Sequence, residues 1–328
     1  MKKVLAVTAA LALLCLGSLA QANVFDLGTG YTNLETVAVG DPGNAADTRY
    51  GTYGSVWYNY NIGKYEVTNA QYCDFLNHKA ISDPYYLYSN SMYGKIGRSG
   101  NDGHYVYTTT SDWANRPVGQ VSYWDACRFA NWLNNGQGTG DTETGAYTLD
   151  GYYRQGGSTI ARNAGAKWCV PTEHEWYKAA YYKGGTGAGY WDYPTQSNSV
   201  PSNDVSVPDA GNNANFSQNG YSIGSPYYTT NVGEFEASMS AYGTFDQGGN
   251  VWEWSEVVTR PGFAFRGLRG GSAFTSSSTL SASTRIDSSP DNEADSYGFR
   301  VVYVPEPSPI IALLGGLVGL LGIRRRRA

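Results

Sequence analysis

Charged residues are scarce in this chain. Asp, Glu, Lys and Arg make up only 16% of its 328 residues, whereas soluble domains carry about 25%. This shortage excludes a coiled coil, a helical bundle and a charged disordered tail. The length is sufficient for one large domain, or two small ones, with a buried core.

Cysteine and histidine are also rare. The chain has 4 Cys and 3 His, without a Cys-x-x-Cys pair or any Cys/His spacing that suits a metal, so the sequence predicts no zinc site. The first cysteine lies in the leader described below. We expect the others to be small buried core residues, and one disulfide with a spare thiol is the alternative. These three are Cys73, Cys127 and Cys169.

A basic stripe is missing as well. The net charge is −5, and without residues 1–22 and the residues after Pro307 the count of Lys+Arg falls from 23 to 17 while Asp+Glu stays at 28, which leaves −11. An acidic domain of this kind repels phosphate backbones. The composition therefore excludes nucleic acid as a partner.

The two ends of the chain do not read as parts of the fold. Residues 1–22 combine two lysines, an apolar stretch and an Ala-Gln-Ala site, which is typical of a signal peptide. Residues 309–323 are apolar but shorter than the roughly 20 residues that span a bilayer comfortably. Four arginines follow at 324–327, a pattern that halts export with the basic end in the cytoplasm. A buried C-terminal strand or helix is the alternative.

A Pro-Glu-Pro motif stands at residues 305–307, just before that apolar run. The tail 304–328 therefore resembles the PEP-CTERM sorting signals of Gram-negative bacteria. This resemblance implies an inner-membrane anchor before processing, recognition by an exosortase-type sorting enzyme, and a final place on the outer surface or in the extracellular matrix.

Glycine and tyrosine are abundant, with 41 Gly and 28 Tyr, which favours turn-rich structure held by aromatic packing. Three short helices are predicted, each opened by a capping residue: Thr68, Ser122 and Thr172. Short strands are expected within 55–62, 147–152 and 298–303, and a long ordered loop over 196–224.

Six short blocks of the sequence resemble, in their order, those of the formylglycine-generating enzymes, or sulfatase-modifying factors. They are residues 62–69, 116–126, 170–176, 248–254, 269–272 and 298–301. The resemblance implies one α+β domain over 23–303, related to C-type lectins, with little regular secondary structure and long loops.

The chemistry of that family needs two cysteines. They hold the copper(I) that oxidises a substrate cysteine with oxygen, and the resemblance places them where this chain has Thr275 and Leu280. Copper(I) is soft and requires thiolates, so we expect no copper and assign no catalytic residue. The His-x-x-x-His-x-Glu cluster of the related iron sulfoxide synthases is absent from the sequence too. Ser272 and Arg285 remain as a frame for the site.

Calcium is the cofactor that the resemblance implies. It places one ion at the side chains of Asp246 and Glu253 and the main-chain carbonyls of Gly249 and Val251. Oxygen ligands of this kind suit Ca²⁺ in loop-rich modules. The alternative is a packed turn in which Glu253 pairs with an arginine or a backbone amide. A second, weaker calcium site is implied near Asn215 and Phe216.

The favoured hypothesis is a non-catalytic module of the cell envelope or matrix that binds a surface polysaccharide or an envelope protein. Its recognition face would comprise Ser272, Phe274, Thr275 and Arg285. Exposed aromatics that can stack on sugars would add to it; the candidates are Tyr85, Tyr86, Tyr88, Tyr93, Tyr190, Trp191 and Tyr193.

Two enzymatic alternatives stay open. One is a formylglycine-generating oxidase that acts on cysteine of exported sulfatases. The other is a polysaccharide hydrolase, which needs a carboxylate pair about 5 to 10 Å apart in a cleft. The carboxylates considered for such a pair are Asp141, Glu143, Asp246, Glu253 and Glu256.

Overall fold

The computed structural model describes residues 28–305 except 31–32, 93, 139, 186–188 and 207. The predicted signal peptide and nearly all of the predicted sorting tail, including its apolar run, lie outside these residues. Among the residues that are described, no helix is both long and apolar enough to span a membrane.

Two four-stranded sheets and a hairpin make up the strand content of the described residues. One sheet has the order β1 (Thr36–Val39), β2 (Tyr60–Gly63), β10 (Val302–Tyr303) and β5 (Trp168–Cys169), with antiparallel pairing throughout. The second has the order β8 (Ile286–Ser288), β7 (Phe265–Arg269), β6 (Trp252–Arg260) and β9 (Tyr297–Gly298), and β9 runs parallel to β6. The strands β3 (Ile96–Ser99) and β4 (Val106–Thr109) form the hairpin.

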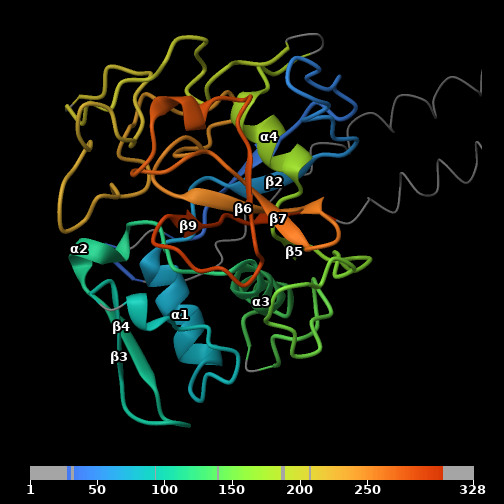
Figure 1. Ribbon diagram of the computed structural model, residues 1–328, viewed down its shortest axis with the longest axis vertical. Coiled ribbons are helices and arrows are strands. Elements are labelled where there is room, and N and C mark those ends of the chain that lie inside the picture. The colour runs from blue at the N-terminus through green and yellow to red at the C-terminus, as the bar shows by residue number, and fades with distance from the viewer. Residues whose placement is uncertain are drawn as a thin grey trace, which may run out of the picture.

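The helices pack on opposite sides of the central β6–β7–β9 strands (Figure 1). Helices α1 (Asn69–Lys79) and α3 (Tyr123–Asn134) lie on one side, and α4 (Glu173–Tyr181) lies on the other. The short α2 (Ser111–Ala114) follows the hairpin, and one-turn helices η1 (Asn90–Met92) and η2 (Ser277–Leu280) sit in loops. A mixed helix-and-strand fold with extensive loops is thus confirmed.

All three predicted helix starts are confirmed, and each is a capping box. The Thr68 hydroxyl accepts the Gln71 N–H at 3.3 Å while the Gln71 amide oxygen accepts the Thr68 N–H at 2.9 Å. Ser122 with Asp125 opens α3 in the same way, and Thr172 opens α4. These reciprocal bonds satisfy two N–H groups that a helix start otherwise leaves unpaired.

Aromatic packing joins the helices to the sheets. Phe129 of α3 contacts Phe75 of α1, with ring centroids 5.3 Å apart, and Phe299 between β9 and β10, at 5.2 Å. The cysteines that belong to this core are buried, as expected, and form no disulfide; they are Cys73, Cys127 and Cys169.

The strand predictions need correction. Residues 55–59 precede the strand β2 instead of belonging to it, and 147–152 form turns with a single bridge from Tyr147 to Arg162. Residues 298–303 divide into β9 and β10 because the chain changes sheets there, and the Arg300 side chain turns into the core between them. The loop over 196–224 is confirmed, since its described residues contain only isolated bridges.

Candidate functional site

A tight turn after β7 sets up the predicted recognition face. Gly270 and Gly271 both have left-handed backbone, with φ of 97° and 77°. A Cβ atom on Gly271 would lie 2.4 Å from the Thr279 hydroxyl, so only glycine fits at this position. Ser272, which follows, is fully buried. It therefore supports the turn and offers no exposed surface.

The two positions of the family's copper thiols have different environments. The Thr275 hydroxyl accepts the Ser272 N–H at 2.9 Å, donates to the Ser272 carbonyl at 3.0 Å and lies 2.7 Å from the Thr279 hydroxyl. Leu280 is fully buried against Ala214 and Phe216. One position is thus part of a hydroxyl network and the other belongs to an apolar cluster, and neither side chain can bind copper(I).

The remaining thiols belong to the buried core. Cys73, Cys127 and Cys169 lie on α1, α3 and β5, and all are buried. Burial raises the pKa of Cys73 to about 12 and that of the other two higher still. Buried thiols with raised pKa values are unreactive in the folded protein.

An exposed aromatic patch adjoins the turn. Phe274 is 41% exposed, and its ring lies 5.3 Å from Tyr228 and 6.1 Å from Tyr221, while those two tyrosines are 4.9 Å apart. We call these three residues the Phe274 patch. The sequence did not indicate the two tyrosines as part of the face, because the long loop that carries Tyr221 and the turns after it that carry Tyr228 have no periodic pattern.

Arg285, the fourth predicted face residue, has other partners. Its guanidinium donates to Glu173 at 3.1 Å, and Glu173 also accepts from the buried Arg269 at 2.7 Å. The Tyr53 ring lies 6.0 Å from Arg285. The structure thus ties Arg285 to the start of α4, whereas Phe274 packs with the long loop.

Glu253, a predicted calcium ligand, is already bound to protein groups. Its carboxylate is fully buried and accepts from Arg300 through Nε at 2.6 Å and Nη2 at 2.7 Å, and from the Trp176 indole at 2.8 Å. Both carboxylate oxygens of Glu253 accept hydrogen bonds. The positive charge beside them is that of the Arg300 guanidinium, which takes the place that a calcium ion would have. As placed, Glu253 does not fit a calcium ligand and matches the alternative of a packed turn.

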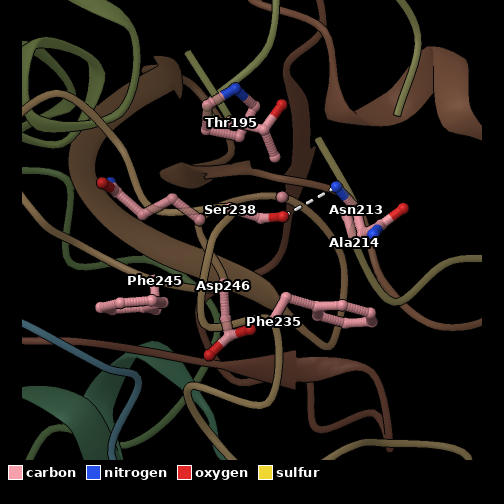
Figure 2. A pocket seen from close by; sticks show the side chains of 10 residues that line it. Thr195, Asn213, Ala214, Phe235, Ser238, Phe245 and Asp246 are labelled. Atoms are coloured by element: carbon pink, nitrogen blue, oxygen red, sulfur yellow. Dashed lines mark hydrogen bonds between the residues drawn. The ribbon is translucent and has the colours of Figure 1, made fainter. Parts of the chain in front are cut away.

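Asp246 is better placed to offer an oxygen. Burial raises its pKa to about 6, and one carboxylate oxygen accepts the Gly233 N–H at 2.6 Å. Figure 2 shows Asp246 at the wall of a small cavity, beside Phe235 and Phe245 and across from Asn213. The cavity holds about 10 Å³ for a water-sized sphere, which is room for one water molecule or ion.

Glu66 completes this carboxylate group and was not predicted. It is 1% exposed, and neither carboxylate oxygen has a hydrogen-bond partner. Burial, and then the nearby charges of Asp246 and Glu253, raise the pKa of Glu66 well above its ordinary value, while Arg300 opposes that shift. The only signal in the sequence was a charged residue between apolar neighbours.

The two predicted calcium regions lie side by side. Asn215 and Gly249 form a bridge, and the carbonyl of Asn215 accepts the Asn250 N–H at 2.9 Å. The side-chain oxygen of Asn215 is buried without a partner, whereas the Phe216 carbonyl accepts from Asn203 at 3.2 Å. Within the described residues, no cluster of three or more His, Cys, Asp or Glu side chains could hold a metal. Any ion here would depend on main-chain oxygens, including those of Gly249 and Val251.

The carboxylates considered for hydrolysis are engaged as well. Glu143 pairs with Arg128 at 2.7 Å, and Glu256 with Arg162 at 3.0 Å. Asp141 accepts the N–H groups of the loop that follows it, with Glu143 N at 2.8 Å. None of these pairs places two free carboxyl groups across an open cleft, which hydrolysis of a glycosidic bond requires.

The tyrosine-rich loops divide between core and surface. Tyr88 and Tyr190 are buried, whereas Tyr86 is 64% exposed. Trp191 is partly covered by Lys183, whose ammonium lies 4.2 Å from its ring centroid. Tyr193 is half-buried and packs against Leu280 and its neighbours. Tyr85 is covered by Arg128 at 4.2 Å, and Tyr93 lies outside the described residues.

Comparison with known proteins gives a family and a fold. Residues 41–304 match the family described as the Sulfatase-modifying factor enzyme 1-like domain. Treponema denticola variable protein 1 is similar in structure, at 20% identity and a TM-score of 0.54, over 85% of this chain and 98% of that one. No curated protein sequence matches this chain.

Two further solved structures are similar. CarF shares 21% identity at a TM-score of 0.52, over 83% of this chain and 99% of its own. PvdO from Pseudomonas aeruginosa shares 17% identity at a TM-score of 0.45, over 87% and 99%. At these identities the likeness concerns the fold alone.

Proposed function

The chain belongs to the Sulfatase-modifying factor enzyme 1-like family, and we propose that it is an exported, non-catalytic member that binds a polysaccharide or a protein of the cell envelope. One observation carries the proposal. At the positions of the family's copper thiols stand a hydroxyl that is bonded within its own turn and a leucine that is fully buried. A family member without copper ligands retains the scaffold and lacks the metal centre at which oxygen would react.

The Phe274 patch is the proposed recognition face. Three aromatic rings within 6.1 Å of one another offer a large, stiff contact area with few rotatable bonds, which is typical of recognition surfaces. The turn beneath it is held by Ser272 and Thr275. A C-type-lectin-like module would use the region in this way, with variable side chains on a fixed frame.

Export and sorting belong to the same proposal. The signal peptide at 1–22 would direct the chain out of the cytoplasm, and the tail at 304–328 would anchor it in the inner membrane until an exosortase-type enzyme processes it. Support comes from the order of the segments in the sequence: a basic start, an apolar run, a Pro-Glu-Pro motif, a second apolar run and four arginines.

Calcium is proposed as a structural cofactor, with Asp246 and the carbonyls of Gly249 and Val251 as its ligands and Glu253 as the counter-charge of Arg300. Support comes from the ion-sized cavity at Asp246, whose lining continues through Gln247 to Gly248, the residue before Gly249, and from the preference of Ca²⁺ for carboxylate and carbonyl oxygens. Calcium should raise the melting temperature of the wild type relative to EDTA, and Asp246→Ala should abolish that rise. An equal rise in both proteins would remove Asp246 from the ligand set.

The decisive experiment is an oxidation assay. The purified mature chain, loaded with copper(I) in air, receives a sulfatase-type peptide that contains cysteine, and mass spectrometry follows the conversion of that cysteine to an aldehyde. We expect no conversion. A folded sample that turns the peptide over would refute the non-catalytic assignment and support the oxidase alternative.

Binding is tested separately. Polysaccharide extracted from cells that make the protein is immobilised, and retention of the wild type is compared with that of Phe274→Ala. The exposed Phe263, which is 62% exposed and packs at 6.0 Å from Phe265, provides the matched control Phe263→Ala. Loss of retention by the Phe274 variant alone supports the recognition face, and equal retention by both variants contradicts it.

A further inference from the structure

A polar groove lies between the loop that follows α1 and the β3–β4 hairpin, at the end of the molecule where the hairpin projects beside α1 (Figure 1). Its volume is about 470 Å³, within the range of small-molecule sites. Aromatic, acidic, amide and guanidinium groups all contribute to its lining, which includes Asp83, Tyr86, Asn90, Arg98, Asp102 and Tyr105.

Tyr86 is held in an unfavourable conformation, and its ring is largely exposed, with the Tyr153 ring as a neighbour at 5.8 Å between centroids. The residue is 64% exposed and has a left-handed backbone, with φ of 58°, which costs a non-glycine residue about 1 to 2 kcal/mol. The loop is fixed by Asp83, whose carboxylate accepts the N–H groups of Leu87 at 2.7 Å and Tyr88 at 3.2 Å. A bulky exposed ring kept in such a conformation is a feature of binding sites.

Arg98 forms the opposite part of the groove. Its guanidinium lies between two rings, 4.6 Å from the centroid of Tyr88 and 4.5 Å from that of Tyr105. It donates to the Asn90 amide oxygen at 3.3 Å and lies 3.7 Å from Asp83. Tyr107 is a further hydrogen-bond partner. The Arg98 side chain is nevertheless 26% exposed, so part of its planar set of five N–H donors faces the groove.

We propose that this groove binds a neutral saccharide, with Tyr86 as the stacking platform and Arg98, Asn90 and Asp102 as partners of its hydroxyl groups. The proposal rests on the binding function proposed above and assigns that function a ligand class and a second site. A sugar ring has an apolar face that packs on an exposed aromatic ring. Each of its hydroxyls both donates and accepts, which matches a groove that offers carboxylate, amide and guanidinium groups together.

The charges that line the groove determine which class of saccharide it favours. The groove contains two carboxylates, Asp83 and Asp102, against the single cation Arg98. An anionic ligand would therefore meet net negative charge, and the guanidinium that could attract it is already close to Asp83 at 3.7 Å. Neutral hexoses are favoured over uronic acids and sugar phosphates on this ground.

The test uses the full mature chain and a defined set of probes. Maltose, cellobiose and lactose serve as neutral disaccharides and glucuronic acid as the anionic probe, with affinities from calorimetry and contacts from saturation-transfer NMR. Tyr86→Asn removes the ring with a residue that tolerates left-handed backbone, and Tyr86→Phe keeps the ring. Tyr50→Asn is the matched control, because Tyr50 is also an exposed tyrosine, at 43%, and belongs neither to the groove nor to the Phe274 patch. Tyr228→Asn changes the Phe274 patch itself.

We expect at least one neutral disaccharide to bind, with affinity about tenfold lower in Tyr86→Asn, which corresponds to about 1.4 kcal/mol. Tyr86→Phe and Tyr50→Asn should stay within about twofold of the wild type. The proposal is overturned if no neutral disaccharide binds, if Tyr86→Asn binds as the wild type does, or if glucuronic acid binds more tightly than the neutral probes. Loss in Tyr228→Asn alone would instead assign the sugar to the Phe274 patch, so failure of this site is distinguishable from failure of the proposed function.

Discussion

Glu66 gives the sharpest test of the electrostatics described above. Its carboxyl group is 1% exposed and has no hydrogen-bond partner, and burial together with the charges of Asp246 and Glu253 raises its pKa well above 4.5. Substitution by glutamine keeps the shape and removes the titrating group. We therefore expect Glu66→Gln to change the pH dependence of stability more than it changes the fold.

The magnitude follows from the proton that the folded state must bind. Stability is lost by about 1.4 kcal/mol for each pH unit between the unfolded pKa of 4.5 and the raised pKa of the folded state, so at pH 7 the loss has an upper bound of about 3 kcal/mol. Because the pKa of Glu66 is higher in the folded state than in the unfolded state, the protein gains stability from binding this proton. That gain is complete below pH 4.5 and is lost as the pH rises. Glu66→Gln should be more stable than the wild type by up to about 3 kcal/mol at pH 7 and roughly equal to it at pH 4.5.

The assay is urea unfolding at pH 4.5, 6 and 8 in EDTA, followed by tryptophan fluorescence. Glu236→Gln is the control, because Glu236 is an exposed carboxylate and its variant should show the same stability difference at each pH. A difference between Glu66→Gln and the wild type that does not grow with pH, or a variant that is less stable at pH 8, would refute the reasoning.

Two further predictions concern the same core. Glu253→Gln should destabilise the fold by about 3 to 5 kcal/mol in urea unfolding, since it removes the carboxylate from the buried Arg300. The partly exposed Lys64–Glu35 pair at 3.1 Å gives the control Glu35→Gln, for which about 0 to 1 kcal/mol is expected. A Glu253 variant as mild as this control would contradict the assigned role. The thiols of Cys73, Cys127 and Cys169, all buried and with raised pKa values, should react with a thiol reagent only on unfolding, and rapid reaction of the native protein would show that one of them is accessible.

Features that depend on neighbouring residues could be predicted from the sequence, whereas contacts between distant segments could not. The helix starts at Thr68, Ser122 and Thr172 could be predicted because a capping box is complete within four residues. The partner of Glu253 could be stated only as an alternative, because Arg300 reaches it through a change of sheets that no local pattern records.

The candidate site divides in the same way. The lack of thiols at Thr275 and Leu280 depends only on which residues stand at these positions. The comparison with the family blocks was therefore sufficient to predict it. The aromatic partners of Phe274, by contrast, come from a loop whose course is set by tertiary packing. Glu66 was missed for a related reason: a carboxylate beside apolar residues is ordinarily solvated, and only the fold shows that this one is enclosed.

The position of β10 in its sheet has a mechanical consequence. The last strand of the described chain lies between β2 and β5 instead of at an edge, and directly after it the Val304 N–H donates to the Lys167 carbonyl at 2.8 Å. A force applied through the chain beyond Pro305 would therefore load an interior strand that is hydrogen-bonded on both sides. A tether at this end would pull on the part of the sheet that is hardest to peel away, whereas the same force applied to β1 would act on an edge.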